Sequence, residues 1–332
     1  MKHPLVSHSC ACGFQLRCLA IAAIPALLLI APSVVAQSYP TKPIRIINTV
    51  SAGGPAELIA RLVGQKLTES WGQQVVVDSR PGAAGIIGAD LVAHAAPDGY
   101  TLLLGSSATM VFAPLLQKST PYDPLRDFAF VNLIVKSPMV LVAHPSIGAK
   151  NITEFVALAK AKPGYYNFGS LGIGSTAHLG GELLKIHTGI DIQHIAYKGG
   201  LPAVTALVAG EVQLLFNSTA TALPHVKNGR LTLVGSGGTR RSPLMPDTPT
   251  IAESFPGFEV VTWYGIVAPA KTPREIVARL NQEISRRLRE KDLFDQLVTQ
   301  GHEPHGGTPE DMRNYTQSEL VKWGKIINVA GL

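Results

Sequence analysis

The sequence has only three cysteines, and their positions exclude several kinds of chemistry. Cys10, Cys12 and Cys18 all lie near the start of the 332-residue chain. From about residue 37 onward, the chain therefore cannot form a disulfide, a thiolate zinc site or a cysteine nucleophile. Its stability must come from burial of an apolar core, and the remaining length suits two lobes better than one.

Aromatic and charged residues are also few, at 6% and 16% of the chain, with a net charge of +6. The aromatic residues are not interleaved with basic ones, so the pattern gives little support to nucleic-acid binding. The densest basic group, Arg286, Arg287 and Arg289, lies beside Glu283 and Glu290 in a stretch of helical periodicity. We interpret this group as a solvated helix face.

The N-terminus has the features of a secretory signal peptide. Lys2 and Arg17 give positive charge to a polar start, residues 18–35 are apolar, and the run ends in small or β-branched residues at Ala36. This order predicts an exported, periplasmic protein whose leader, residues 1–36, is cleaved near Ala36.

A membrane anchor and a lipoprotein are the alternatives to a cleaved leader. A membrane anchor would need a longer uninterrupted span, and Pro25 and Pro32 break this one, with no stop-transfer charges after it. A lipoprotein would need a box of small residues before a cysteine, and neither Cys12 nor Cys18 has one. No further transmembrane segment is expected beyond the leader.

The rest of the chain alternates short apolar runs with amphipathic stretches, which predicts an α/β fold. Strands are expected at 44–50, 74–78 and 100–105, then at 139–143, 166–169, 192–197, 212–216, 231–236 and 263–268. Helices are expected at 55–71 and 86–96, then at 152–161, 176–188, 202–209, 273–290 and 309–329.

The α/β pattern restarts once, which predicts two lobes with the chain crossing out and back. We expect residues 37–141 to begin lobe 1, residues 142–262 to form lobe 2, and residues 263–332 to return to lobe 1 with the C-terminal helices. The crossovers are placed near 139–143 and 262–268, although 231–236 is an alternative return strand.

Candidate ligand contacts come from the turns that follow strands, since ligands of open α/β sheets bind beyond the carboxyl ends of strands. Glycines there let backbone amides approach an anion, and helix N-termini favour negative charge. The turns supply Ser51, Ala52, Gly53 and Glu57; Gly82, Ala83, Ala84 and Gly85; Ser106 and Ser107; and Ser170, Ser175, Thr176 and His178. The alternative is that these are tight connections without a ligand, with Glu57 satisfying only its own helix dipole.

The sequence disfavours a dinucleotide-binding enzyme. Gly172, Gly174 and Ala177 match the glycine fingerprint, but the acidic residue should close the following strand, and Asp191 precedes that strand.

Hydrolase and metal sites are also disfavoured. Ser170 has Gly172 two residues after it, but Phe168 stands where a nucleophile elbow needs glycine. His178 and Glu182 share a helix face, but no third zinc ligand is evident. We therefore expect no catalytic residue, no metal and no cofactor.

A series of short segments along the mature chain, taken together in their order and spacing, resembles one known family. These segments are Tyr39-Pro40-Thr41-Lys42-Pro43-Ile44-Arg45, Gly53-Gly54, Ala60-Arg61, Arg80-Pro81-Gly82-Ala83-Ala84-Gly85, Pro97-Asp98-Gly99-Tyr100-Thr101-Leu102, Tyr122-Asp123-Pro124, Asp127-Phe128, His178-Leu179, Gly181-Glu182, Tyr197-Lys198-Gly199, Leu223-Pro224-His225, Arg241-Ser242-Pro243, Pro246-Asp247, Pro249-Thr250 and Trp263-Tyr264-Gly265. The chain resembles the Bug receptors, the TctC-type solute-binding proteins of tripartite tricarboxylate transporters.

The resemblance implies a two-lobed periplasmic binding fold of type II-like form that closes on a small carboxylate. In the family the first two strand–helix turns grip a carboxylate, which points to Ser51, Ala52, Gly53 and the turn at 82–85. The remaining lining is implied to include Ser106, Ser107, Ser170, Ser175, Thr176, His178 and Tyr197.

Three departures from the family pattern bear on the ligand. Glu57 stands where the family usually has Asp, and Thr49-Val50 where it has a proline–phenylalanine pair. Asn217-Ser218 stands where it has Asp-Asn. Since Asn217 would remove a cleft acid that pairs with an amine, we expect a carboxylate without an amine.

The leading hypothesis is a monomeric receptor that delivers a small carboxylate to the permease subunits of a tripartite transporter. A sensor module that presents the same closed form to a membrane kinase is the alternative. An exported enzyme is the third possibility and has the least support from the residues.

Overall fold

The computed structural model describes residues 39–50 and 53–332 of the chain. The predicted leader, Ser51 and Ala52 lie outside the described residues. The described residues belong to one unit, Tyr39–Leu332.

Lobe 1 begins with three parallel strands and their covering helices. The elements are β1 Ile44–Asn48, α1 Pro55–Trp71, β2 Val75–Ser79, α2 Ile86–Ala93 and β3 Thr101–Ser106, followed by the short α3 Ala113–Leu116. β1 pairs in parallel with both β2 and β3. Pro55 suits the first turn of α1, and Gly72 ends this helix in the left-handed conformation.

Lobe 2 repeats the α/β pattern after the first crossover. Its elements are α4 Ile152–Ala161, β5 Asn167–Ser170, α5 Thr176–Thr188, β6 Gln193–Ala196, α6 Gly200–Ala209, β7 Leu214–Ser218, α7 Thr219–Lys227, β8 Thr232–Ser236 and α8 Ile251–Ser254. β5 pairs in parallel with β6 and with β7. Polar caps start the helices, with Asn151 before α4 and Ser175 before α5.

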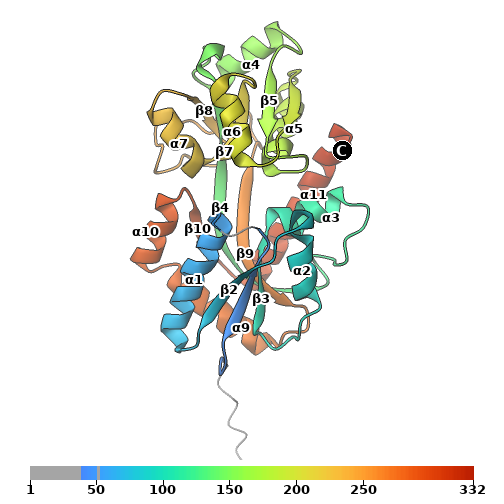
Figure 1. Cartoon of the computed structure of the whole chain (residues 1–332), viewed down its shortest axis with the longest axis vertical. Coiled ribbons are helices and arrows are strands. Elements are labelled where there is room, and N and C mark those ends of the chain that lie inside the picture. The colour runs from blue at the N-terminus through green and yellow to red at the C-terminus, as the bar shows by residue number, and fades with distance from the viewer. Residues whose placement is uncertain (1–38, 51–52) are drawn as a thin grey trace, which may run out of the picture. The chain divides into compact units, whose positions relative to one another are not determined.

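Two long strands connect the lobes, as Figure 1 shows. β4, Phe128–Ala143, pairs with β9, Val261–Pro269, along residues 128–138 and with β7 and β8 along residues 139–143. One continuous strand thus belongs to the sheets of both lobes. The predicted strand at 139–143 is only the last part of β4. We call β4 and β9 the hinge pair.

The C-terminal elements differ from the expectation. The predicted helix at 273–290 ends earlier, as α9 Arg274–Arg287, and is followed by α10 Lys291–Thr299 and β10 Glu303–Gly306. β10 lies beside β4 in an antiparallel pair. The last helix, α11 Pro309–Ala330, packs against β4 in lobe 1 and α5 in lobe 2.

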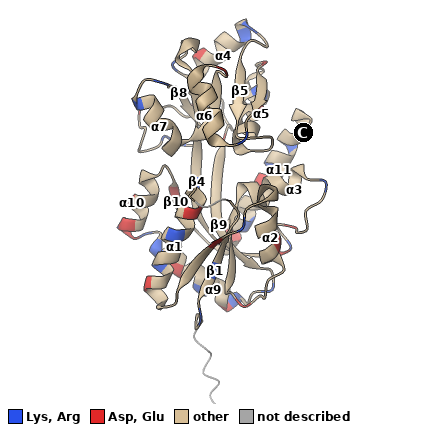
Figure 2. Cartoon of the chain, viewed as in Figure 1, with Lys and Arg blue, Asp and Glu red and all other residues tan. Residues whose placement is uncertain are grey.

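Side chains alternate between two cores along β1. Ile44 and Ile46 are buried in one cluster with Leu102, whereas Ile47 is buried in the other with Leu103. This alternation is expected of a strand covered on both faces. Basic and acidic side chains are interspersed over the helices (Figure 2), and no described helix is long and apolar enough to cross a membrane.

Candidate ligand-binding site

A cavity of about 550 Å³ lies where the ends of the lobe 1 strands face the start of α5 in lobe 2. It also reaches the hinge pair, through Met139, Thr262 and Tyr264. We call this cavity the cleft. Its lining consists of Asn48, Thr49, Val50, Ala56, Pro81, Gly82, Ala84, Gly85, Leu104, Ser106, Ser107, Ala108, Phe112, Met139, Leu171, Gly172, Ile173, Gly174, Ser175, Thr176, Ala177, Thr262 and Tyr264.

The described lining of the cleft contains no Asp, Glu, Lys, Arg or His. Three helices begin at its wall, however: α1 near Ala56, α2 after Gly85, and α5 at Thr176. The first backbone amides of a helix lack intrahelical partners and carry partial positive charge. The cleft can therefore hold an anion through amides and hydroxyls, with no formal positive charge of its own.

The turn between β2 and α2 has an unusual backbone. Gly82, Ala83, Ala84 and Gly85 all have positive φ, at 129°, 46°, 55° and 91°. Four positive φ values in succession turn the chain sharply between β2 and α2, next to the cleft. Positive φ strains a residue that has a side chain, and strained backbone of this kind clusters at ligand-binding sites.

Close packing holds this turn against β1 and the residues after β3. A Cβ atom on Gly85 would lie 2.5 Å from Thr109 Cγ2 and 3.0 Å from Thr49 Cβ. Only glycine fits there, because both the space and the φ value exclude a side chain.

The end of β3 brings two serines to the wall of the cleft. The Ser106 amide donates to Thr109 Oγ1 at 3.1 Å, which fixes the bend after the strand. Ser107 Oγ is buried and has no hydrogen-bond partner among the described residues. Because Ser107 is fully buried, its hydroxyl lies behind the surface of the cleft and not open to it.

On the lobe 2 side, the turn before α5 is held by side chains behind it. Ser175 caps α5 by accepting from the His178 amide, and its hydroxyl donates to the Gly172 carbonyl at 2.7 Å. His178 Nδ1 accepts from the Gly174 amide at 3.1 Å. Ser170 Oγ contacts both the amide and the carbonyl of Gly172 at 3.1 Å.

Two histidines stack behind this turn. The rings of His178 and His194 lie 3.8 Å apart, and His194 Nε2 is 2.7 Å from Ser170 Oγ. Burial is the main cause that lowers the pKa of each histidine to about 4, so both are neutral at pH 7. They position the turn without adding charge to the cleft.

The hinge pair contributes residues that the sequence analysis did not select. Thr262 Oγ1 donates to Thr176 Oγ1 at 3.2 Å, which joins β9 to the start of α5. Burial raises the pKa of the Tyr264 phenol to about 12, so it stays protonated as a donor. Tyr264 could have been selected from the sequence, because the Trp263-Tyr264-Gly265 segment is part of the family resemblance.

The structure brings together seven of the predicted contacts at the cleft wall: Gly82, Ala84, Gly85, Ser106, Ser107, Ser175 and Thr176. Seven others lie outside the lining, namely Gly53, Glu57, Ala83, Ser170, His178, Tyr197 and Asn217. Ser170 and His178 lie directly behind the wall. Contact of any of these residues with a ligand stays a prediction.

The side chains of Glu57 and Asn217 form hydrogen bonds with residues close to them in the sequence. Glu57 Oε2 accepts from the Gly53 amide at 2.5 Å, and Oε1 accepts from Arg61 Nε at 2.8 Å. The Gly53 bond and then the Arg61 contact lower the pKa of Glu57, which caps its own helix. Asn217 is buried in β7, where its Oδ1 accepts from the Ser218 amide at 2.8 Å.

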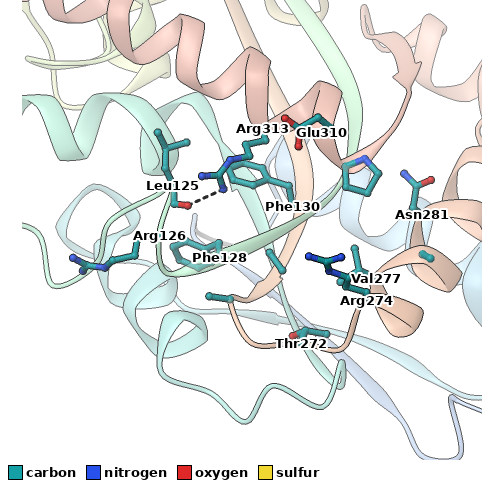
Figure 3. A pocket seen from close by; sticks show the side chains of 14 residues that line it. Leu125, Arg126, Phe128, Phe130, Thr272, Arg274, Val277, Asn281, Glu310 and Arg313 are labelled. Atoms are coloured by element: carbon teal, nitrogen blue, oxygen red, sulfur yellow. Dashed lines mark hydrogen bonds between the residues drawn. The ribbon is translucent and has the colours of Figure 1, made fainter.

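Other cavities lack the features of the cleft. One of about 540 Å³ lies at the far end of β4, where Arg126, Arg274 and Arg313 surround Phe128 and Phe130 (Figure 3). Lobe 1 alone lines it, so lobe closure would not enclose a ligand there. The described residues contain no group of three or more His, Cys, Asp or Glu side chains that could hold a metal ion.

Two α/β lobes that share a hinge pair and face each other across a neutral cleft define a two-lobed solute-binding protein. The chain belongs to the tripartite tricarboxylate transporter family of receptors, whose family model matches residues 59–332. The sequence-based expectations of family and fold class are thereby confirmed.

Individual relatives agree over most of the chain. BugT of Bordetella pertussis is 36% identical over 304 residues, which are 91% of this chain and 93% of BugT. The solved structure of R. palustris Rpa4515 with adipate is 32% identical, with a TM-score of 0.78 over 88% of this chain and 98% of that one. The periplasmic binding protein BugD is 30% identical, with a TM-score of 0.74 over 88% and 99% of the two chains.

Proposed function

We propose that this protein is an exported receptor that captures a small carboxylate in the cleft and delivers it to the membrane subunits of a tripartite transporter. The observation that carries the proposal is a cleft where three helix N-termini converge from both lobes with no ionised side chain in its described lining. A carboxylate is the small organic anion that such amides and hydroxyls accommodate. The adipate held by the R. palustris relative is a carboxylate of this kind.

The lining also supports a ligand without an amine. An ammonium group in a cleft would need a carboxylate partner, and the described lining offers none. Asn217 lies just outside the lining, since it pairs with Val140, the residue after Met139 of the cleft wall. The uncharged lining as a whole, together with Asn217, disfavours an acidic amino acid.

Binding without chemical conversion is part of the proposal. The hydroxyls of Ser106 and Thr176 reach the cleft, but no described lining residue could serve as their general base. We also propose that the chain crosses between the lobes at 139–143 and 262–268, that the receptor acts as a monomer, and that residues 1–36 direct it to the periplasm.

Thermal unfolding with a panel of carboxylates tests this proposal. Adipate and malate represent the expected class, dimethyl adipate is the uncharged control, and aspartate carries an added amine. A ligand at 100 times its Kd adds about 2.7 kcal/mol to the free energy of unfolding, because it binds only the folded state. We expect Tm to rise with carboxylate concentration and not with dimethyl adipate or aspartate. Equal shifts for the acid and its ester would contradict an anion site.

A further inference from the structure

Apolar side chains from both lobes line the cleft. Leu104, Phe112 and Met139 are buried in its wall. Val50 of lobe 1 and Ile173 of lobe 2 also line it, although 43% and 77% of these residues are exposed. Covering such a side chain with an apolar group is favourable, because it removes apolar surface from water. The two exposed residues therefore offer apolar surface to a ligand from both lobes.

Several polar side chains of the lining are already bonded to other protein groups. Asn48 Nδ2 donates to the Val50 carbonyl and to Ser79 Oγ, each at 3.0 Å. Thr262 Oγ1 donates to Thr176 Oγ1 at 3.2 Å. A ligand with hydroxyls along its body would therefore lose bound water in the cleft without gaining an equal number of hydrogen bonds. A ligand with an apolar body has no such loss.

The turn between β5 and α5 holds Ile173 at the cleft wall. Gly172 and Gly174, on either side of it, have φ values of 131° and 77°, which favour glycine. The Gly172 amide donates to Ser170 Oγ and the Gly174 amide to His178 Nδ1, each at 3.1 Å. Ser170 and His178 are both buried. Because both neighbours of Ile173 are bonded to buried side chains, the turn keeps this isoleucine at the cleft and out of the core of lobe 2.

We propose that the cleft selects a carboxylate whose body is an alkyl or aryl group, and that Val50 and Ile173 are the residues that select it. This preference rests on the proposed function, because it chooses among the carboxylates that the cleft would hold. The carboxylate bonds to amides at the helix starts, and its body lies against the apolar side chains of the two lobes. When the lobes come together, ligand and side chains leave water at the same time, which favours the closed form.

Calorimetric titration with four compounds tests this selectivity. Hexanoate has an apolar body, gluconate has the same length and charge with a hydroxyl on each carbon of its body, butanoate is shorter, and hexan-1-ol lacks the charge. Each methylene that becomes buried should lower Kd about fourfold, so hexanoate should bind about fifteenfold more tightly than butanoate. Gluconate should bind more weakly than hexanoate by at least a similar factor, and hexan-1-ol should bind far more weakly.

Two variants make the same substitution inside and outside the cleft. Ile173→Ser changes the cleft wall, whereas Ile186→Ser changes a residue of α5 that is 42% exposed and lies outside the lining. Ile173→Ser should raise the hexanoate Kd about tenfold and the butanoate Kd by less, because the shorter body reaches less apolar surface. Ile186→Ser should leave both Kd values unchanged. Since Ile173 is largely exposed, its replacement leaves the core of lobe 2 intact.

The outcomes separate this preference from the proposed function. Gluconate that binds as tightly as hexanoate, or a hexanoate Kd that Ile173→Ser leaves unchanged, would overturn the preference and leave carboxylate capture standing. The same holds if none of the four compounds binds while malate raises Tm. Hexan-1-ol that binds as tightly as hexanoate would contradict the anion site and leave the apolar preference standing. If no carboxylate binds at all, both fail together.

Discussion

His178 and His194 show how single residues behind the cleft shape it without touching the ligand space. His178 accepts a hydrogen bond from the Gly174 amide. His194 is hydrogen-bonded to Ser170, whose hydroxyl accepts from the Gly172 amide. Both rings must stay neutral to stack 3.8 Å apart, since two imidazolium ions at that distance would repel each other. The lobe 2 wall of the cleft therefore depends on two histidines that must both stay unprotonated.

Because of this histidine pair, the folded protein should become less stable as the pH falls. The folded pKa of each ring is about 4, below the ordinary value of 6.5, so the unfolded chain binds more protons between these values. Their contribution is complete above pH 6.5 and is lost as the pH falls toward 4. We expect each histidine to lower the free energy of unfolding by about 1–2 kcal/mol when the pH falls from 7.5 to 5.

Urea denaturation of the wild type and of His194→Phe at both pH values measures this loss. The phenylalanine keeps an aromatic ring against Phe168 but cannot be protonated, so the variant should lose less stability on acidification. His302 shares the lowered pKa and remains in both proteins. An identical loss in the two proteins would contradict the assignment to the histidine pair.

Among the elements, helices with clear caps were predicted best. α1 and α5 have the predicted bounds, because Pro55 and Ser175 start them and Gly72 and Gly189 end them in the left-handed conformation. Each of these capping residues lies within a few residues of the helix end that it determines. The three helix starts at the wall of the cleft could therefore be located without the structure.

Elements that depend on distant partners were missed. The first eleven residues of β4 form a strand because they pair with β9, more than a hundred residues later in the chain. The break between α9 and α10 has no glycine or proline; Glu290 simply adopts an extended backbone before α10. Thr262 and Tyr264 are placed by the pairing of β9 with β4, and Met139 by the pairing of β4 with β7, so periodicity could not identify them.

The cap of α5 should matter for ligand binding as well as for stability. Ser175→Ala removes a cap hydrogen bond at the cleft wall, and Asn151→Ala removes the equivalent one from α4, away from the cleft. Each should lower the free energy of unfolding by about 1 kcal/mol. Only Ser175→Ala should also weaken the binding of a cleft carboxylate, because the amides of α5 would no longer be held in place.

Calorimetric titration of both variants with adipate separates the two effects. If both lose affinity equally, α5 acts only through the stability of lobe 2. If Ser175→Ala keeps wild-type affinity despite its lost stability, the start of α5 does not contact the ligand.

At the scale of the whole molecule, the hinge pair links events in one lobe to those in the other. α11 adds a second connection between the lobes, since Lys322 Nζ lies 3.2 Å from Glu259 Oε2. A ligand that bonds to amides of both lobes is enclosed only when the lobes come together. Affinity then reports the difference in contacts between the closed and open forms.

Capture of a carboxylate in the cleft is tested most directly by a crystal structure with the carboxylate that raises Tm most. We expect this carboxylate to lie in the cleft, with its oxygens within hydrogen-bonding distance of amides at 82–85 or at the start of α5, and with residues from both lobes around it. A cleft left without the carboxylate at saturating concentration, or the carboxylate bound only elsewhere on the protein, would contradict capture in the cleft.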